Sequence, residues 1–233
     1  MTIFLSENIL ETSTLPPEES FHCAKVLRMR QNEEIQVIDG KGNLFTAKIT
    51  VPDAKCTQID IISVEKEFEK RGYYLHLAVA PTKNIDRFEW FVEKAVEIGV
   101  DCITPLVCRY SERKTVNISR LEKIIVSAAK QSLKAYLPKL NPITNFNDFI
   151  TQTTENQRFI AHCYNTPKTP LFSICQPKQS TLVMIGAEGD FSEEEVKAAE
   201  SVGFQSVSLG NARLRTETAG VAAVHTVGLI NSL

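Results

Sequence analysis

The chain has 233 residues, of which 43% are hydrophobic and 23% charged, and its formal net charge is −2. This composition is typical of a globular protein and excludes a disordered, collagen-like or repeat-based chain. No run of residues approaches the ~20 apolar positions that span a bilayer, and the first residues lack the pattern of a signal peptide. The small negative charge argues mildly against nucleic acid as a partner, although a local basic face can coexist with it.

The first 70 residues are predicted to be rich in β structure. Alternating polar and apolar residues predict strands at 34–38, 44–49 and 59–64, and the turn Asp39–Asn43 separates the first two. Residues 21–30 could form a short helix, and the charged run Glu65–Arg71 is a plausible linker.

From Tyr73 onwards, strands and helices alternate. Strands are expected at 75–80, 102–107, 159–163, 182–185 and 207–209, and helices at 86–99, from 119, from 192 to 203, and from about 216. Capping boxes, in which a Ser and a Glu three residues later satisfy the first amides of a helix, are predicted at Ser119–Glu122 and Ser192–Glu195. The fold class is therefore α/β, with a small β domain followed by a mostly parallel sheet covered by helices.

The six cysteines, at positions 23, 56, 102, 108, 163 and 175, are scattered and form no CxxC pair. We therefore expect reduced thiols, packed in a cytoplasmic protein. His, Cys and carboxylate side chains do not stand together at the spacing of metal ligands, so no metal is expected.

Two glycine-bearing turns are the candidate ligand-binding segments. Ile185–Ser192 joins a buried strand to a capped helix, at the end of the strand where ligands of parallel sheets bind. Leu209–Ala219 also leads from a strand into a helix, and it carries Arg213 and Arg215, which with a helix N-terminus form an anion-binding surface. By itself, the first pattern is about as compatible with an ordinary strand-to-helix turn as with a ligand site. The second is about as compatible with a surface loop that holds a weak Arg–Glu pair as with an anion-binding surface.

Further segments, in a fixed order along nearly the whole chain, identify a family. They are His22–Arg28, with the pattern His-x-x-x-Val-Leu-Arg, the helical Lys94–Val100, and Leu214–Ala219, which is the most specific. Together with the two turns, they resemble the bacterial 16S rRNA (uracil-N3)-methyltransferase family, within the SPOUT superfamily of knotted methyltransferases.

The chain departs from the family pattern in two places. The family's usual Gly-Pro-Glu-Gly-Gly is here Gly186–Asp190, with Ala at 187 and Asp at 190. Loss of the proline loosens the turn, but aspartate tolerates left-handed backbone angles better than most residues, so we expect the turn to form. Before Leu214 the family commonly has Arg followed by Ile or Val, whereas this chain has Ala212 and Arg213, which weakens a role for that arginine.

The resemblance implies an N-terminal PUA-like β-barrel over 1–70 that binds RNA, and a SPOUT domain with a trefoil knot over 73–233. It implies a homodimer and a bent S-adenosylmethionine in the knot, with no metal. It assigns cofactor binding to Ala161, His162, Gly186, Glu188, Gly189, Leu209, Gly210, Arg213, Leu214 and Thr216. The substrate is expected to be 16S rRNA, in the small ribosomal subunit or a late precursor, held by His22, Lys25, Arg28, Arg30 and Arg109.

The expected catalytic residues are Arg215 and Glu217. Uracil N3 carries a proton and is a poor nucleophile until that proton leaves, and Arg215 could stabilise the charge that then develops on the carbonyl oxygens. Glu217 or Glu188 could accept the proton or hold Arg215 in place, and for Glu217 we favour the second role, because a carboxylate beside two arginines is a weak base. Two other functions stay open: a related enzyme that methylates a ribose 2′-oxygen or another base, and an RNA-binding module without catalysis.

Overall fold

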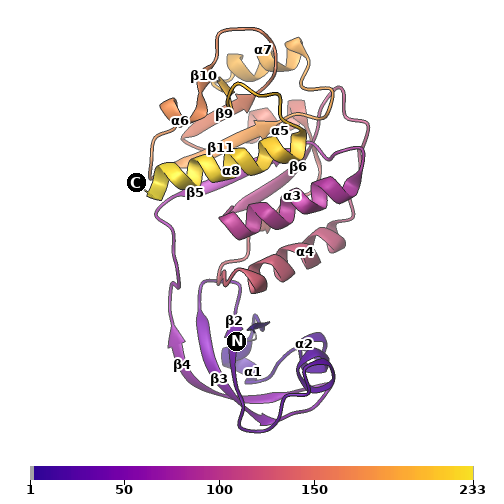
Figure 1. The fold of residues 1–233 in the computed structure, drawn as a ribbon, viewed down its shortest axis with the longest axis vertical. Coiled ribbons are helices and arrows are strands. Elements are labelled where there is room, and N and C mark those ends of the chain that lie inside the picture. Colours follow the sequence, from indigo (N-terminus) through magenta and orange to yellow (C-terminus); the bar gives the residue numbers. More distant parts are fainter. Residues whose placement is uncertain (1–2, 233) are drawn as a thin grey trace. The chain divides into compact units, whose positions relative to one another are not determined.

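The computed structural model describes residues 3–232, which form two compact units (Figure 1). The first contains the N-terminal part up to Lys70 together with Val126–Leu137, and the second contains Arg71–Ile125 and the chain from Pro138 onwards. Residues 126–137 thus group with the first compact unit, although they follow the start of the second one in the chain.

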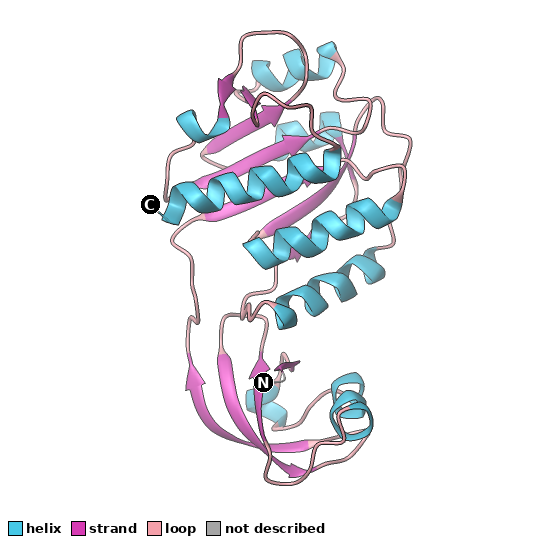
Figure 2. Cartoon of the chain, viewed as in Figure 1, coloured by secondary structure: helices cyan, strands magenta, loops and turns pink. Residues whose placement is uncertain are grey.

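The first unit is built on a bent sheet of four strands (Figure 2). Its strands are β1 (Ile3–Leu5), β2 (Glu34–Ile38), β3 (Leu44–Val51) and β4 (Gln58–Glu65), in that order, with β1 parallel to β2 and the other pairs antiparallel. The three strands predicted from alternation are confirmed. Alternate residues of β2 and β3, namely Ile35, Val37, Phe45, Ala47 and Ile49, are buried in one core cluster.

The helical segments of this unit are short. They are α1 (Ile9–Thr12), α2 (Pro17–Phe21) and a π-helical turn, His22–Val26, in place of the single helix expected over 21–30. Arg28, two residues after the π turn, has a left-handed backbone with φ of +55°, which ends the helical run.

The second unit contains an eight-stranded sheet in which the pairs are parallel, as the alternation of strands and helices predicted. The order is β10-β12-β9-β11-β5-β6-β7, with β8 also paired to β6. The strands are β5 (Tyr74–Val79), β6 (Cys102–Val107), β7 (Lys139–Leu140), β8 (Thr144–Asn145), β9 (Gln157–Ala161), β10 (Thr169–Pro170), β11 (Ser180–Ile185) and β12 (Gln205–Ser208).

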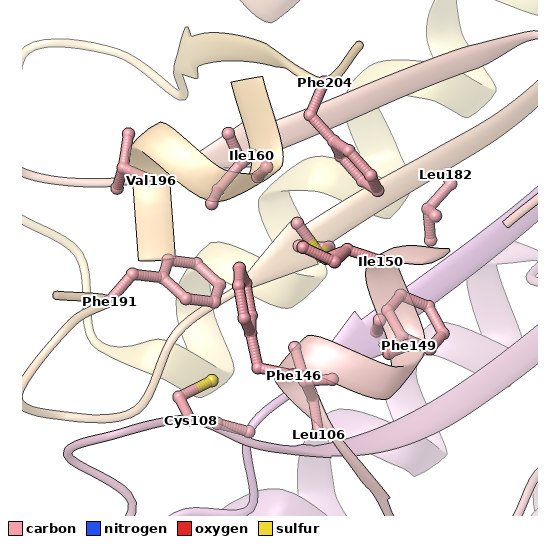
Figure 3. Close-up of a cluster of buried hydrophobic side chains, with 14 of the residues drawn as sticks. Leu106, Cys108, Phe146, Phe149, Ile150, Ile160, Leu182, Phe191, Val196 and Phe204 are labelled. Atoms are coloured by element: carbon pink, nitrogen blue, oxygen red, sulfur yellow. The ribbon is translucent and has the colours of Figure 1, made fainter. Parts of the chain in front are cut away.

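Helices cover the sheet of the second unit. They are α3 (Ile85–Ile98), α4 (Ile118–Gln131, whose last residues belong to the first unit), α5 (Phe146–Gln152), α6 (Leu171–Ile174), α7 (Glu193–Ser201) and α8 (Thr216–Ser232). Figure 1 shows α3 and α8 side by side, and Gly220 makes this approach possible, because a Cβ there would lie 2.6 Å from the ring of Phe91. Helices α5 and α7 pack on a separate cluster that includes Phe146, Ile160 and Phe191 (Figure 3).

Of the two predicted capping boxes, one is confirmed and one is wrong. The Ser192 side chain accepts from the Glu195 amide, and the Glu195 carboxylate accepts from the Ser192 amide. Helix α4, in contrast, begins before Ser119. Asn117 Oδ1 accepts from the Arg120 amide at 3.1 Å, because asparagine is as good an N-cap as serine and stands two residues earlier.

A buried polar cluster lies within the sheet, apart from the two turns. The Nδ1 atom of His76 on β5 lies 2.6 Å from the Glu155 carboxylate, and its Nε2 atom lies 2.7 Å from the Thr104 hydroxyl. Burial alone lowers the pKa of His76, but the Cys102 side chain and the Glu155 carboxylate more than offset it and raise that pKa to about 9. His76 is therefore a charged side chain paired with Glu155 inside the fold.

Candidate active site

Strand order brings the predicted site segments to one edge of the sheet. Ala161, the last residue of β9, is paired with Ile185 at the end of β11 and with Val207 near the end of β12. All three strands are parallel, so the loops that follow them begin side by side at their carboxyl ends, where ligands of α/β sheets bind. The predicted cofactor residues of segments 161–162, 186–189 and 209–216 thus belong to three adjacent loops.

The turn after β11 requires glycine at its first position. A Cβ on Gly186 would lie 3.0 Å from the Asp190 carbonyl carbon and 3.0 Å from the Phe191 amide nitrogen, so any other residue would push on backbone. The turn closes by a hydrogen bond of 2.9 Å from the Asp190 amide to the Ala187 carbonyl, and Asp190 has φ of +68°. The expectation that aspartate would tolerate a left-handed backbone here, and that the turn would form without proline, is confirmed.

Asp190 also joins two of the three loops. Its carboxylate accepts a hydrogen bond of 2.7 Å from the Cys163 amide, in the loop after β9, and one of 2.8 Å from the Phe191 amide. The Tyr164 hydroxyl donates to the Phe191 carbonyl at 2.7 Å and adds a second connection between the same loops. A glycine at 190, as in the family pattern, has no side chain to make the Cys163 bond.

Loops from β5 and β6 complete this edge of the sheet. The Glu188 carboxylate accepts a hydrogen bond of 2.8 Å from the Lys83 amide, and the Arg109 amide donates to the Glu195 carboxylate at 2.8 Å. A Cβ on Gly189 would lie 2.7 Å from the Cβ of Tyr110, so the second glycine of the turn is needed for the close approach of the β6 loop. Sequence reasoning missed Tyr110 and gave Lys83 no role at this site, because nothing in the local pattern indicates that they contact residues 188 and 189.

The loop after β12 leads into α8. Gly210 has φ of +123°, Arg213 and Arg215 are exposed, and the Arg215 carbonyl accepts from the Ala219 amide to begin the helix. Leu209 and Leu214 are half-buried, whereas Thr216 and Glu217 are buried in the first turn of α8. Within residues 3–232 no ion pair joins Glu217 to either arginine, so the Arg–Glu pair considered from the sequence does not form.

His162, the first residue after β9, has a buried imidazole ring. The residue is only 7% exposed, and neither ring nitrogen has a hydrogen-bond partner among the described residues. Burial and the nearby Lys168 lower its pKa, so the imidazole is neutral at pH 7. Buried polar atoms are nearly always paired, so this orphaned ring fits a polar molecule bound at this edge of the sheet.

The predicted RNA-binding residues are divided between the two units. His22 and Lys25 lie in the π turn of the first unit, and Arg28 and Arg30 follow it; all but His22 are exposed. Arg109 is exposed in the β6 loop of the second unit.

Further expectations concern metals, cysteines and membranes. The described residues contain no group of three or more His, Cys, Asp or Glu side chains that could hold a metal ion. All six cysteines are free; four are buried, whereas Cys56 and Cys163 are exposed and so depart from the expected packing. Between residues 3 and 232, no helix is long and apolar enough to cross a membrane.

Comparison with known families defines the class of protein. Residues 69–228 match the RNA methyltransferase domain family, and residues 15–61 match the RNA methyltransferase PUA domain family. The parallel sheet with three adjacent loops at its carboxyl edge thus belongs to an RNA methyltransferase with an attached PUA domain.

Individual relatives identify the family within the RNA methyltransferases. The chain is 34% identical over 202 residues to the ribosomal RNA small subunit methyltransferase E of Mesomycoplasma hyopneumoniae, which covers 84% of this chain and 86% of the relative. A probable rRNA-methyltransferase from Porphyromonas gingivalis has a similar structure, with a TM-score of 0.94, 35% identity, and coverage of 100% of this chain and 99% of that one. The Neisseria gonorrhoeae ribosomal RNA small subunit methyltransferase E, solved with bound S-adenosyl methionine, has a TM-score of 0.87 and 29% identity, and the match covers 99% and 98% of the two chains. The chain belongs to the ribosomal RNA small subunit methyltransferase E family.

Proposed function

We propose that this protein transfers a methyl group from S-adenosylmethionine to N3 of a specific uridine of 16S rRNA. The observation that carries the proposal is the register of β9, β11 and β12, which joins three loops at one sheet edge in a chain of this family. The substrate is the small ribosomal subunit or a late precursor, and methylation takes place in the cytoplasm, where subunits are assembled.

The three loops would hold the cofactor largely through backbone groups. Ala161, His162, the turn Gly186–Gly189 and the loop 209–216 supply amides and carbonyls, and the absence of side chains at the two glycines lets a ligand approach them. The sulfonium of the cofactor supplies the methyl group, so the protein's own task is to align the acceptor nitrogen with it and to exclude water. We place these loops in a trefoil knot, with the site completed by the second subunit of a homodimer.

Arg215 is the proposed catalytic residue. It is exposed at the end of the third loop, directly before α8, where its guanidinium can reach a base that has been turned out of the RNA. There it would stabilise the negative charge that develops on the uracil oxygens as N3 loses its proton. Glu217 lies buried in the first turn of α8, where a carboxylate interacts favourably with the helix dipole, and we propose that it positions the Arg215 loop.

Residues 1–70 would form the RNA-binding domain, a PUA-like barrel, and residues 73–233 the methyltransferase domain. The exposed Lys25, Arg28 and Arg30 would contact phosphates, with His22 beside them, and Arg109 would contribute a phosphate contact from the methyltransferase domain. Replacement of both Lys25 and Arg28 by alanine should weaken RNA binding and reduce the slope of log K against log salt by about 1–2. Replacement of the exposed Lys66 serves as the control; an unchanged slope in the double variant would remove these residues from the interface.

The decisive experiment uses a strain that lacks the protein. Mass spectrometry of its 16S rRNA should show the loss of one N3-methyluridine, and purified protein with S-adenosylmethionine should restore it on under-methylated small subunits. Loss of a ribose-methylated or other base-methylated nucleoside would instead identify a different methyltransferase of the superfamily. Calorimetry provides the test against a binding module without catalysis, because such a module would not bind S-adenosylmethionine.

A further inference from the structure

His162 is the one side chain among the described residues in which two buried ring nitrogens both lack partners. A buried donor or acceptor without a partner costs about 1–3 kcal/mol, so such a group is retained only where something uses it. The backbone around it is well bonded by comparison, since Lys168 donates to the His162 carbonyl at 2.9 Å and the next amide, of Cys163, donates to Asp190.

The position of the ring ties it to the proposed cofactor site. Because Ala161 pairs with Ile185 and with Val207, His162 begins the middle one of the three loops, between Gly186 and Ser208. It follows Ile160 by two residues, the repeat that puts side chains on one face of a strand, and Ile160 belongs to the cluster under α5 and α7. The ring of Tyr164, two residues further along, lies 5.6 Å from the His162 ring and packs against the same cluster.

The chemistry of the ring restricts what it can bind. A neutral imidazole offers one N–H donor and one nitrogen acceptor, on opposite sides of the ring. The charged groups whose fields act on the pKa of this ring are Lys168, Asp190 and Glu200, of which Asp190 stands in the turn after β11. A carboxylate would bind a positively charged ligand group better than this ring does, and a cation would bind a negatively charged one better. The neutral ring therefore matches an uncharged ligand group that can both donate and accept hydrogen bonds.

In S-adenosylmethionine the uncharged groups of this kind are the ribose hydroxyls and the edge of adenine, whereas the methionine end carries the ammonium, carboxylate and sulfonium charges. We propose that the His162 side chain binds the nucleoside part of the cofactor through its ring nitrogens, in addition to the backbone contacts of the three loops. This inference rests on the proposed function, and it assigns to one side chain a selective hold on the adenosine moiety.

Calorimetry on the full-length protein tests the proposal with three ligands: S-adenosylmethionine, S-adenosylhomocysteine and 5′-methylthioadenosine, which lacks the charged methionine end. His162→Phe, which keeps a ring but removes both polar atoms, should weaken all three by a similar factor of about tenfold or more, because each has the same nucleoside. His162→Gln, which keeps a donor and an acceptor, should retain more affinity than the phenylalanine variant. His225→Phe, at an exposed position of α8, is the matched control and should bind all three ligands as the unchanged protein does.

Stability without ligand separates this role from a structural one. The ring nitrogens have no partners in the described part of the chain, so His162→Phe should leave the unfolding midpoint of the unliganded protein unchanged or raise it. A lowered midpoint together with unchanged ligand affinity would mean that His162 is a structural residue and would overturn the proposal. Weaker binding of S-adenosylmethionine with unchanged binding of 5′-methylthioadenosine would also overturn it, because the ring would then contact the charged end. Failure of the unchanged protein to bind S-adenosylmethionine would refute the proposed function itself.

Discussion

Asp190, the residue that departs from the family pattern, can be tested by three substitutions with different expected costs. Its carboxylate accepts from the Cys163 and Phe191 amides at 2.7 and 2.8 Å, and hydrogen bonds to charged groups contribute about 1.5–3 kcal/mol each when buried. Cys163 is exposed, so the lower end of that range applies to its bond. The left-handed backbone, with φ of +68°, costs a residue other than glycine about 1–2 kcal/mol.

These terms predict an order. Asp190→Ala loses both side-chain bonds and keeps the backbone penalty, so it should lower the free energy of unfolding by about 2–4 kcal/mol. Asp190→Gly loses the same bonds but relieves the backbone, so its loss should be smaller by about 1 kcal/mol. Asp190→Asn keeps an acceptor oxygen and tolerates the conformation, and should lose least.

Urea unfolding, followed by the fluorescence of Trp90, measures this order. Trp90 is the single tryptophan of the chain and lies on α3, in the same unit as Asp190. If alanine were no worse than glycine at position 190, the argument from the left-handed backbone would be wrong. If neither substitution changed the free energy of unfolding, the hydrogen bond from Cys163 to Asp190 would not contribute to stability.

Three further predictions concern the turn, the buried ion pair and the catalytic arginine. Gly186→Ala should lower stability by about 1–3 kcal/mol and weaken S-adenosylmethionine binding in calorimetry, because the added Cβ meets backbone at 3.0 Å, whereas Gly72→Ala, with open space around it, should change neither. The raised pKa of His76 contributes up to about 3 kcal/mol of stability that is fully present below its ordinary pKa of 6.5 and is lost as the pH rises through about 9; urea titrations should show this loss, and Glu155→Gln, which removes one of its two causes, should make the loss smaller. Arg215→Ala should bind the cofactor normally in calorimetry but methylate subunits at least about tenfold more slowly, and a wild-type rate would remove Arg215 from the mechanism.

The two turns were recognised from local sequence because their requirements are local. Each follows a short strand, and each contains glycine where the backbone must approach other atoms closely or adopt positive φ. The Ser192–Glu195 capping box fixes where the helix after the first turn begins. Where two equally good caps stood close together, as at Asn117 and Ser119, local sequence could not decide between them, and the expected helix start was wrong.

By itself, then, the sequence determined the class of fold, the mostly parallel sheet and the positions of the two turns, because hydrophobic period, glycine and capping residues act over a few neighbouring positions. Only the tertiary structure decided that β9 lies between β11 and β12, and hence that three loops begin at one edge. It also decided that Asp190 bonds to Cys163 and that, among residues 3–232, Glu217 forms no pair with the arginines and the buried His162 ring has no hydrogen-bond partner. The physical reason is that strand order and the partners of a polar side chain depend on residues far apart in the chain, whose meeting no local pattern records.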